Sequence, residues 1–148
     1  MDFKQFTIKS QEAIQKAAEL ATALGSPAVE TAHLLKGVFS EDAPISQFLL
    51  QRLGVNAQLL DQKLEEQLQK LSKVSGSNQQ PYLSSAANQA ITKSKEYLKT
   101  FGDSYVALEH LLLGILAGTD PIAQLLNNQG VGEKALIEAI NELRKGNK

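Results

Sequence analysis

The chain has 148 residues, and a chain of this length can bury about 70% of its unfolded surface, which is enough for one ordinary core. It contains no cysteine, which excludes disulfides and thiolate metal sites. With 15 basic and 16 acidic residues the formal net charge is -1, so no global field recruits nucleic acid or an anionic membrane. This balance favours a partner that is recognised by shape and local contacts.

No segment of the sequence has the pattern of a membrane span or of a secretory signal. The longest apolar stretch, residues 111–117, is interrupted by Gly114 and is far shorter than the roughly 20 residues that a membrane helix needs. The first ten residues, MDFKQFTIKS, lack an apolar core and a small-residue cleavage site. We therefore expect a cytoplasmic protein without a membrane partner.

The first half of the chain has the hydrophobic spacing of four helices. The face of the first helix is apolar at Ile14, Ala17, Ala18, Ala21 and Leu24. Gly25 then stands where a left-handed C-cap would need a glycine. A short second helix is predicted around VETAHLLKGVF, residues 29–39, and Pro44 fits the first turn of a third helix. The fourth helix is expected over residues 56–71, where Leu60, Leu64, Leu68 and Leu71 form its buried stripe.

The second half repeats this pattern. Sliding the chain by 77 positions aligns residues 10–39 with residues 87–116, and ten of these thirty positions are identical, where average residue usage gives roughly two. The identical pairs are Ala13/Ala90, Ile14/Ile91, Lys16/Lys93, Glu19/Glu96, Gly25/Gly102, Val29/Val106, His33/His110, Leu34/Leu111, Leu35/Leu112 and Gly37/Gly114. The register continues through Pro44/Pro121 and, after a one-residue gap, through Gly54/Gly130. The repeat therefore covers nearly the whole chain.

The repeat predicts the second set of helices and the architecture. The face of its first helix is formed by Ala87, Ile91, Ser94, Leu98 and Phe101, and its last helix, over residues 132–144, has Leu136, Ile140 and Leu143 as its stripe. No convincing strand occurs. We expect an all-α fold of eight helices, as two four-helix repeats related by a pseudo-two-fold axis. Repeat one spans 6–71, a linker 72–81 and repeat two 82–146, within one domain over 1–148, and a groove is expected at the junction.

These motifs carry a resemblance to a known family. The doubled HLL-x-G phrase, the opening FT before the first helix and the segment FGDSYVALEHLLLGIL resemble the N-terminal Clp repeat domain of the Clp family of AAA+ unfoldases. The resemblance covers about residues 6–144, and the polar linker and the ending AINELRKGNK are most similar to ClpB-type disaggregases. It implies a domain that weakly binds unfolded or aggregated polypeptide and assists its delivery to an ATPase ring. The implied partners are such substrates and the rest of a hexameric ClpB-type chain.

The resemblance also implies a site. The polar peptide-binding residues of the family fall on Thr7, Asp103 and Glu109, and all three match in type. Each also has a structural interpretation: Thr7 as a helix N-cap, Asp103 in a turn, and Glu109 in the first turn of its helix. The repeat partners of Asp103 and Glu109 are Ser26 and Ala32, so the two carboxylates occur in one half only. This asymmetry predicts one site, in which hydroxyl and carboxylate groups hydrogen-bond an extended peptide.

The sequence contains no pattern of an enzyme. It lacks the GxxxxGK[ST] of a P-loop and the G-x-S-x-G of a nucleophile elbow, so we expect no ATP binding, no catalysis and no cofactor. The only histidines, His33 and His110, occupy equivalent positions beside leucines without HExxH spacing, which favours structural roles over a zinc site. Lys93, Lys95 and Lys99 share one helix, but acidic residues offset them, so no nucleic-acid partner is expected.

Two other functions stay open at this point. An N-domain of the ClpC or ClpA type, from protease-linked unfoldases, would dock adaptor proteins or marked substrates. ClpC-like domains carry Glu-His in both halves, whereas this chain has Ala32 before His33, which disfavours a paired phosphoarginine-type site. A stand-alone double Clp repeat that acts as an interaction protein would require the natural chain to end near Lys148.

Overall fold

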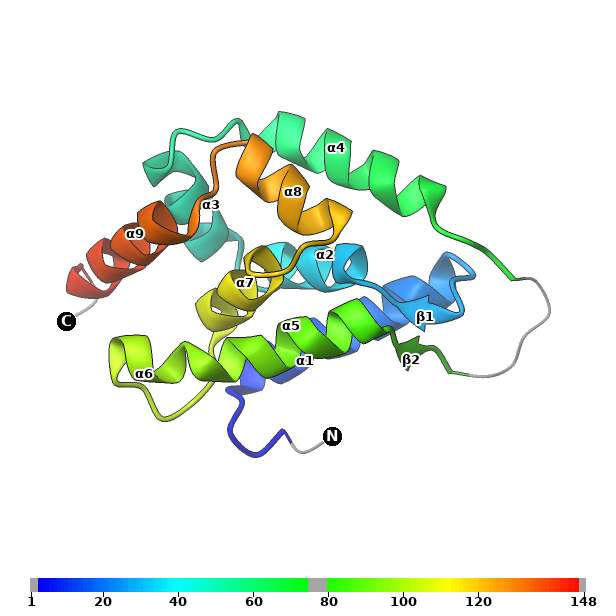
Figure 1. The fold of residues 1–148 in the computed structure, drawn as a ribbon, viewed down its shortest axis with the longest axis horizontal. Helices are drawn as coiled ribbons and strands as arrows, with labels where there is room; N and C mark the ends of the chain where they lie inside the picture. Colours follow the sequence, from blue (N-terminus) through cyan, green and yellow to red (C-terminus); the bar gives the residue numbers. More distant parts are fainter. Residues whose placement is uncertain (1–2, 75–79, 147–148) are drawn as a thin grey trace.

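The structure, a computed structural model, describes residues 3–74 and 80–146 (Figure 1). The predicted all-α class is confirmed. The helical segments of these residues are α1 (Ile8–Ala23), α2 (Thr31–Glu41), α3 (Ala43–Arg52), α4 (Ala57–Lys70), α5 (Ser85–Glu96), α6 (Leu98–Phe101), α7 (Leu108–Leu116), α8 (Pro121–Asn128) and α9 (Glu133–Lys145). Part of the predicted linker, residues 75–79, lies outside the described residues.

The first helix of repeat two is interrupted, which is why residues 3–74 and 80–146 contain nine helical segments where eight helices were predicted. At the interruption the N–H of Tyr97 donates to the carbonyl of Ser94, and the N–H of Thr100 donates to the carbonyl of Tyr97. These bonds span three residues instead of four, so the last turn is tighter than an α-helix. Taken together as one interrupted helix, α5 and α6 leave four helices in each half.

The expectation that no strand occurs is wrong at short segments that join the halves. Strand β1 (Ala28–Val29) pairs in parallel with strand β2 (Tyr82–Leu83), with Val29 opposite Leu83. Phe6 forms a parallel bridge with Val106. The shift of 77 residues turns one pairing into the other, because Phe6 corresponds to Leu83 and Val29 to Val106. Each half therefore pairs its entry segment with the other half.

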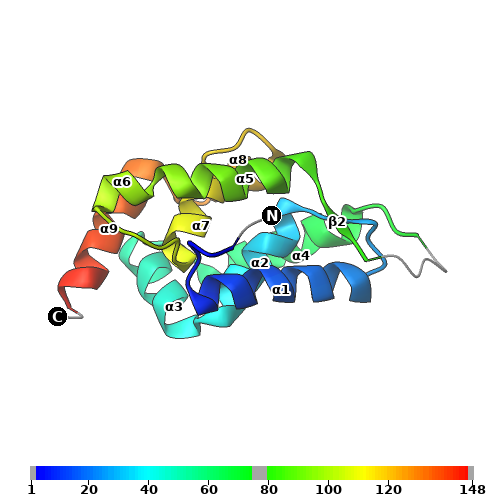
Figure 2. The ribbon, with the colours of Figure 1, turned by 90° about the horizontal axis from the view of Figure 1, so that it is seen from below.

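The packing of the helices has the same pseudo-two-fold symmetry. Helix α1 packs on α2 as α5 packs on α7, and α3 packs on α9 as α8 packs on α4. In Figure 2, α5 lies above and α1 below, with α2 and α7 between them. The buried apolar side chains of both halves form one continuous cluster. The two repeats are therefore interlocked around one core.

Two glycines allow the closest helix contacts, as the repeated HLL-x-G phrase predicts. A Cβ atom at Gly37 would lie 2.3 Å from the carbonyl oxygen of Ala13, and a Cβ at Gly114 would lie 2.2 Å from that of Ala90. Both obstacles are backbone atoms, which cannot rotate aside. The glycines therefore set the distance between α1 and α2 and between α5 and α7.

Candidate functional site

Thr7 lies where the two halves of the chain meet. Its side chain caps α1 by accepting a hydrogen bond from the N–H of Ser10 at 3.1 Å, as its structural interpretation predicts. Its own N–H donates to the carbonyl of Val106 at 2.9 Å, and the hydroxyl of Ser10 donates to the same carbonyl at 2.8 Å. Thr7 is thus held against the extended segment that leads into α7.

Asp103 and Glu109 lie at the two ends of this segment, and Arg144 joins them. The guanidinium donates to Asp103 Oδ1 at 3.0 Å and lies 2.7 Å from Oδ2, and its Nη2 lies 3.3 Å from Glu109 Oε2. The group also stacks on the Phe101 ring, 4.6 Å from its centroid. The side chains are half-buried, with 30% of Arg144, 25% of Asp103 and 12% of Glu109 exposed.

The two histidines make the same backbone contact but differ at the other ring nitrogen. Nδ1 of His110 accepts from the N–H of Ala107 at 2.7 Å, and Nδ1 of His33 accepts from the N–H of Glu30 at 2.8 Å. The neutral rings therefore carry their proton on Nε2. Nε2 of His110 lies 2.8 Å from Asp103 Oδ2, whereas Nε2 of His33 is buried without a partner among the described residues. Both rings accept a hydrogen bond from a backbone N–H at the start of a helix, and only the ring of His110 has a partner at both nitrogens among the described residues.

The group of Asp103, Glu109, His110 and Arg144, here named the charged cluster, carries an excess negative charge. Burial raises the pKa of Asp103, but the hydrogen bond and charge of Arg144 and the hydrogen bond of His110 outweigh it and hold this pKa below its ordinary value. Burial lowers the pKa of His110, so its ring is neutral at pH 7. Two carboxylates and one guanidinium then give the charged cluster a net charge of -1.

The structure brings Asp103 and Glu109 together but does not link Thr7 to them directly. Within the described residues, the hydrogen bonds of the Thr7 side chain go to Ser10 alone. Apolar surface adjoins this region, because Ile8 is 74% exposed and Tyr105 is 59% exposed. The candidate site therefore combines a half-buried negative pair with exposed apolar side chains at the entry of α1 and α7.

Arg144 was not identified from the sequence, although a signal for it exists. After the one-residue gap, the repeat register places Arg144 opposite Leu68, which is buried in α4. A cation at a position where the other repeat has a buried leucine indicates a paired partner, because an unpaired buried charge is costly. The register of 77 residues before the gap places Ser26 and Ala32 opposite the two carboxylates, so repeat one has an uncharged residue at each of the three positions.

We expect the two histidines to titrate at different pH values. Burial lowers the pKa of His33 to about 4. For His110, the hydrogen bond to Asp103 opposes the effect of burial and should keep its pKa closer to the ordinary value of 6.5. Following the ring Cε1 proton resonances against pH measures both. The substitution Asp103→Ser should lower the midpoint of His110 toward that of His33, and equal midpoints in the unsubstituted chain would contradict this account.

Two further properties bear on the site. In the described part of the chain, no group of three or more histidine or carboxylate side chains is placed to hold a metal ion. Over the same residues, no helix combines the length and the apolar composition that a bilayer span requires.

Comparison with known proteins points to one family. The sequence matches the Clp repeat (R) N-terminal domain over residues 5–129. The Chaperone protein ClpB of Bacteroides thetaiotaomicron is 43% identical over 148 residues, which cover 100% of this chain and 17% of that protein. This chain thus spans a small part of the curated relative that it matches.

Solved structures share the fold. The Hsp104 N-terminal domain from Candida albicans superposes with a TM-score of 0.82 at 23% identity, over 95% of this chain and 92% of the other. A complex of the ClpV N-domain with VipB peptide superposes with a TM-score of 0.71 at 15% identity, over 90% of this chain and 83% of the other. At these identities the likeness shows the fold alone.

Proposed function

This chain belongs to the Clp repeat N-terminal domain family, as a ClpB-type N-terminal domain of an AAA+ chaperone, and from this premise we propose that it captures unfolded polypeptide. The captured chain, free or in an aggregate, is then passed to an ATPase ring formed by the rest of a longer protein. The domain itself needs no catalytic group for this role. The ClpV N-domain, which shares the fold, was solved in complex with a peptide, and this supports peptide binding here.

The observation that carries the proposal is the charged cluster beside exposed apolar surface. Among the described residues, Glu109 Oε1 accepts no hydrogen bond, so this oxygen keeps its acceptor positions, on a side chain that is 12% exposed. Ile8, which follows Thr7, and Tyr105, which lies between the two carboxylates in the chain, expose apolar surface. Thr7 holds the entry of α1 against the segment between the carboxylates. Together these groups fit an extended chain with apolar side chains better than they fit a small charged ligand.

Such a site binds weakly, and weak binding suits transfer. Each hydrogen bond to the peptide contributes about 1 kcal/mol, and association costs several kcal/mol of lost freedom. A few contacts therefore give sequence-tolerant capture. In a ring of several copies, as the ClpB-type resemblance implies, neighbouring sites would raise retention through effective concentration.

A titration followed by NMR tests the proposal. We expect reduced, carbamidomethylated α-lactalbumin, which is permanently unfolded, to shift the backbone amides near Thr7, Tyr105 and Glu109, while the native protein shifts none. The double variant Asp103→Asn and Glu109→Gln keeps the shape but removes both charges. It should bind the unfolded protein about tenfold more weakly, which corresponds to about 1.4 kcal/mol.

The control variant is Glu19→Gln with Glu66→Gln, because both glutamates are exposed and the same two charges are removed elsewhere. It should bind like the unsubstituted chain. If the variant with Asp103→Asn and Glu109→Gln binds as tightly as the unsubstituted chain, the charged cluster does not take part in substrate binding. If neither the unfolded nor the native protein shifts any amide, recognition requires an adaptor or the assembled ring, and the adaptor-docking function replaces this one.

A further inference from the structure

The pseudo-symmetry reveals a difference between the two repeats at the turn after their second helix. In repeat one, two ion pairs join α1 to the turn between α2 and α3. Lys9 Nζ lies 2.5 Å from Asp42 Oδ2, and Lys16 Nζ lies 2.8 Å from Glu41 Oε2. These pairs link the helix to the turn across the space between them.

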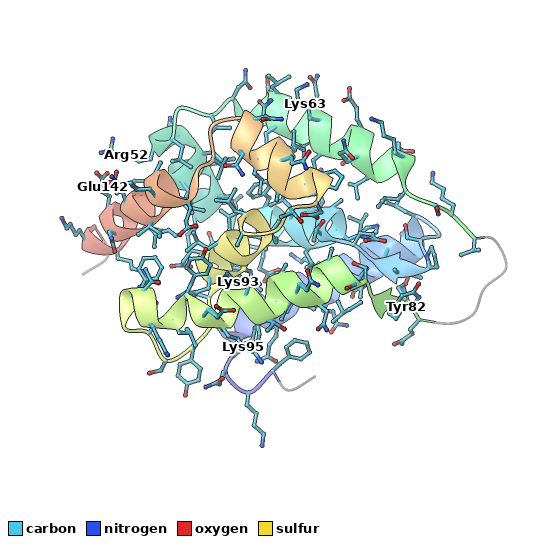
Figure 3. All side chains as sticks on the ribbon, viewed as in Figure 1. Arg52, Lys63, Tyr82, Lys93, Lys95 and Glu142 are labelled. Carbon is cyan, nitrogen blue, oxygen red and sulfur yellow. The ribbon has the colours of Figure 1, made fainter. Side chains whose placement is uncertain are left out.

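Repeat two lacks the residues for these two ion pairs. The register of 77 residues places Ala86 opposite Lys9, Gly118 opposite Glu41 and Thr119 opposite Asp42. Only Lys93 keeps the residue of its counterpart, and its amine lies 3.3 Å from Glu96 on its own helix. Lys93, labelled on α5 in Figure 3, is one of the residues that line the opening in repeat two.

The opening is a groove of about 420 Å³ between α5 and the turn from α7 to α8, here named the repeat-two groove. This volume lies within the range of ligand sites. The lining of the groove runs along α5 from Ala86 to Glu96, and the ten helical steps between these residues correspond to about 15 Å. An extended chain rises about 3.3 Å per residue, so four or five residues fit along it.

The chemistry of the lining indicates what the groove can hold. Small residues, including Ala117 and Gly118, line part of it and permit close approach of a ligand backbone. Amide and hydroxyl side chains such as Gln89 and Thr92 offer both donors and acceptors. The charged groups are engaged, since Lys93 pairs with Glu96 and Asp120 accepts a hydrogen bond from Thr31. Uncharged donors and acceptors match peptide groups rather than ions.

We propose that the repeat-two groove is a second binding site, which takes an extended polypeptide segment with small, uncharged side chains. This inference rests on the proposed function, because both sites would hold parts of the same substrate. The groove lies at the C-terminal end of α7 and the charged cluster at its N-terminal end. Helix α7 has 9 residues and is therefore about 14 Å long, so one unfolded chain reaches both sites.

Closing the groove with the residues of repeat one provides the test. The triple variant Ala86→Lys, Gly118→Glu and Thr119→Asp recreates both ion pairs. A Cβ at Gly118 would lie 3.0 Å from Asp120 Oδ1, at the end of a side chain that can rotate, so we expect this variant to fold. The double variant Ala86→Lys and Thr119→Asp leaves Gly118 in place and serves if the triple variant does not fold.

The probe is a capped ten-residue peptide of alanine, serine, threonine and valine, titrated by NMR. We expect shifts at Gln89, Thr92 and Thr119 in the unsubstituted chain and at least fivefold weaker binding in the closed variant. The matched control, Gln58→Asp with Gln62→Lys, adds a charge pair on the exposed face of α4 and should bind normally.

The outcomes separate the two sites. Equal binding by the closed and unsubstituted chains, or no shifts along α5, would overturn the groove as a site. In that case, shifts by the unfolded protein near Thr7 and Glu109 would leave the proposed function intact. Shifts by both probes along α5 alone would establish the groove and remove the charged cluster from substrate binding.

Discussion

Replacing Gly37 or Gly114 by alanine is expected to lower the free energy of unfolding by about 3 kcal/mol, at the upper end of the usual cost of overpacking. The added methyl group would lie 2.3 Å or 2.2 Å from a carbonyl oxygen of the facing helix, so the helices must move apart. For a chain of this length the loss corresponds to a fall of roughly 6–12 °C in Tm. Because the core is continuous, each substitution should shift one cooperative transition, as measured by circular dichroism.

Gly132→Ala is the matched control for this prediction. A Cβ at Gly132 would meet no atom within 4 Å, and its backbone φ of -96° suits alanine. Gly132 is the N-cap of α9, where the loss of a favoured capping residue should cost less than about 1 kcal/mol. If Gly37→Ala were no more damaging than Gly132→Ala, close backbone contact would not set the helix spacing.

Arg144→Leu is expected to lower the free energy of unfolding by about 2 kcal/mol at pH 7, somewhat less than the loss of one partner of a fully buried ion pair. The substitution leaves Asp103 and Glu109 half-buried without their counter-charge. The triple variant Asp103→Ser, Glu109→Ala and Arg144→Leu introduces the three residues that repeat one has at these positions. It should recover most of the lost stability, because an ion pair replaced by apolar groups costs little.

The pH dependence gives this prediction a second measurement. The pKa of Asp103 is lower in the folded state than in the unfolded chain, so its stabilising contribution is present above about pH 4. It is lost as the pH falls through the folded-state pKa. Urea denaturation should therefore give a lower free energy of unfolding for Arg144→Leu than for the unsubstituted chain at pH 7. At pH 3 the difference between the two free energies should be much smaller. A triple variant no more stable than Arg144→Leu alone would show that repeat two cannot adopt the uncharged arrangement of repeat one.

Much of the fold was predictable because its signals are local. The spacing of apolar residues indicates helices, and Gly25 and Gly102 have the positive φ angles, 72° and 69°, that the predicted left-handed caps require. The break at Tyr97 was not predictable, since the apolar spacing continues through it into α6. The short strand pairings were also missed. They are two residues long and join segments that are distant in the chain, so no alternating pattern marks them.

The candidate site, like the fold, was predictable from the sequence only in part. The identities of Thr7, Asp103 and Glu109, and the absence of both carboxylates from repeat one, followed from the sequence and its resemblance to a family. The sequence did not identify Arg144, which contacts partners 41 and 35 residues away. It did not indicate the open groove either, although the register contains the exchanges of Lys9 for Ala86 and Asp42 for Thr119.

The sequence alone therefore determined the helical class, the doubled architecture and the family. These depend on periodicity, turn residues and repetition, which are properties of neighbours along the chain. Only the tertiary structure decided which charges are paired, which histidine has a carboxylate at its Nε2 and which groove is open. These depend on distances of a few ångströms between helices from different parts of the chain. An ion pair forms only when the packing of the helices brings its two charged groups within a few ångströms of each other.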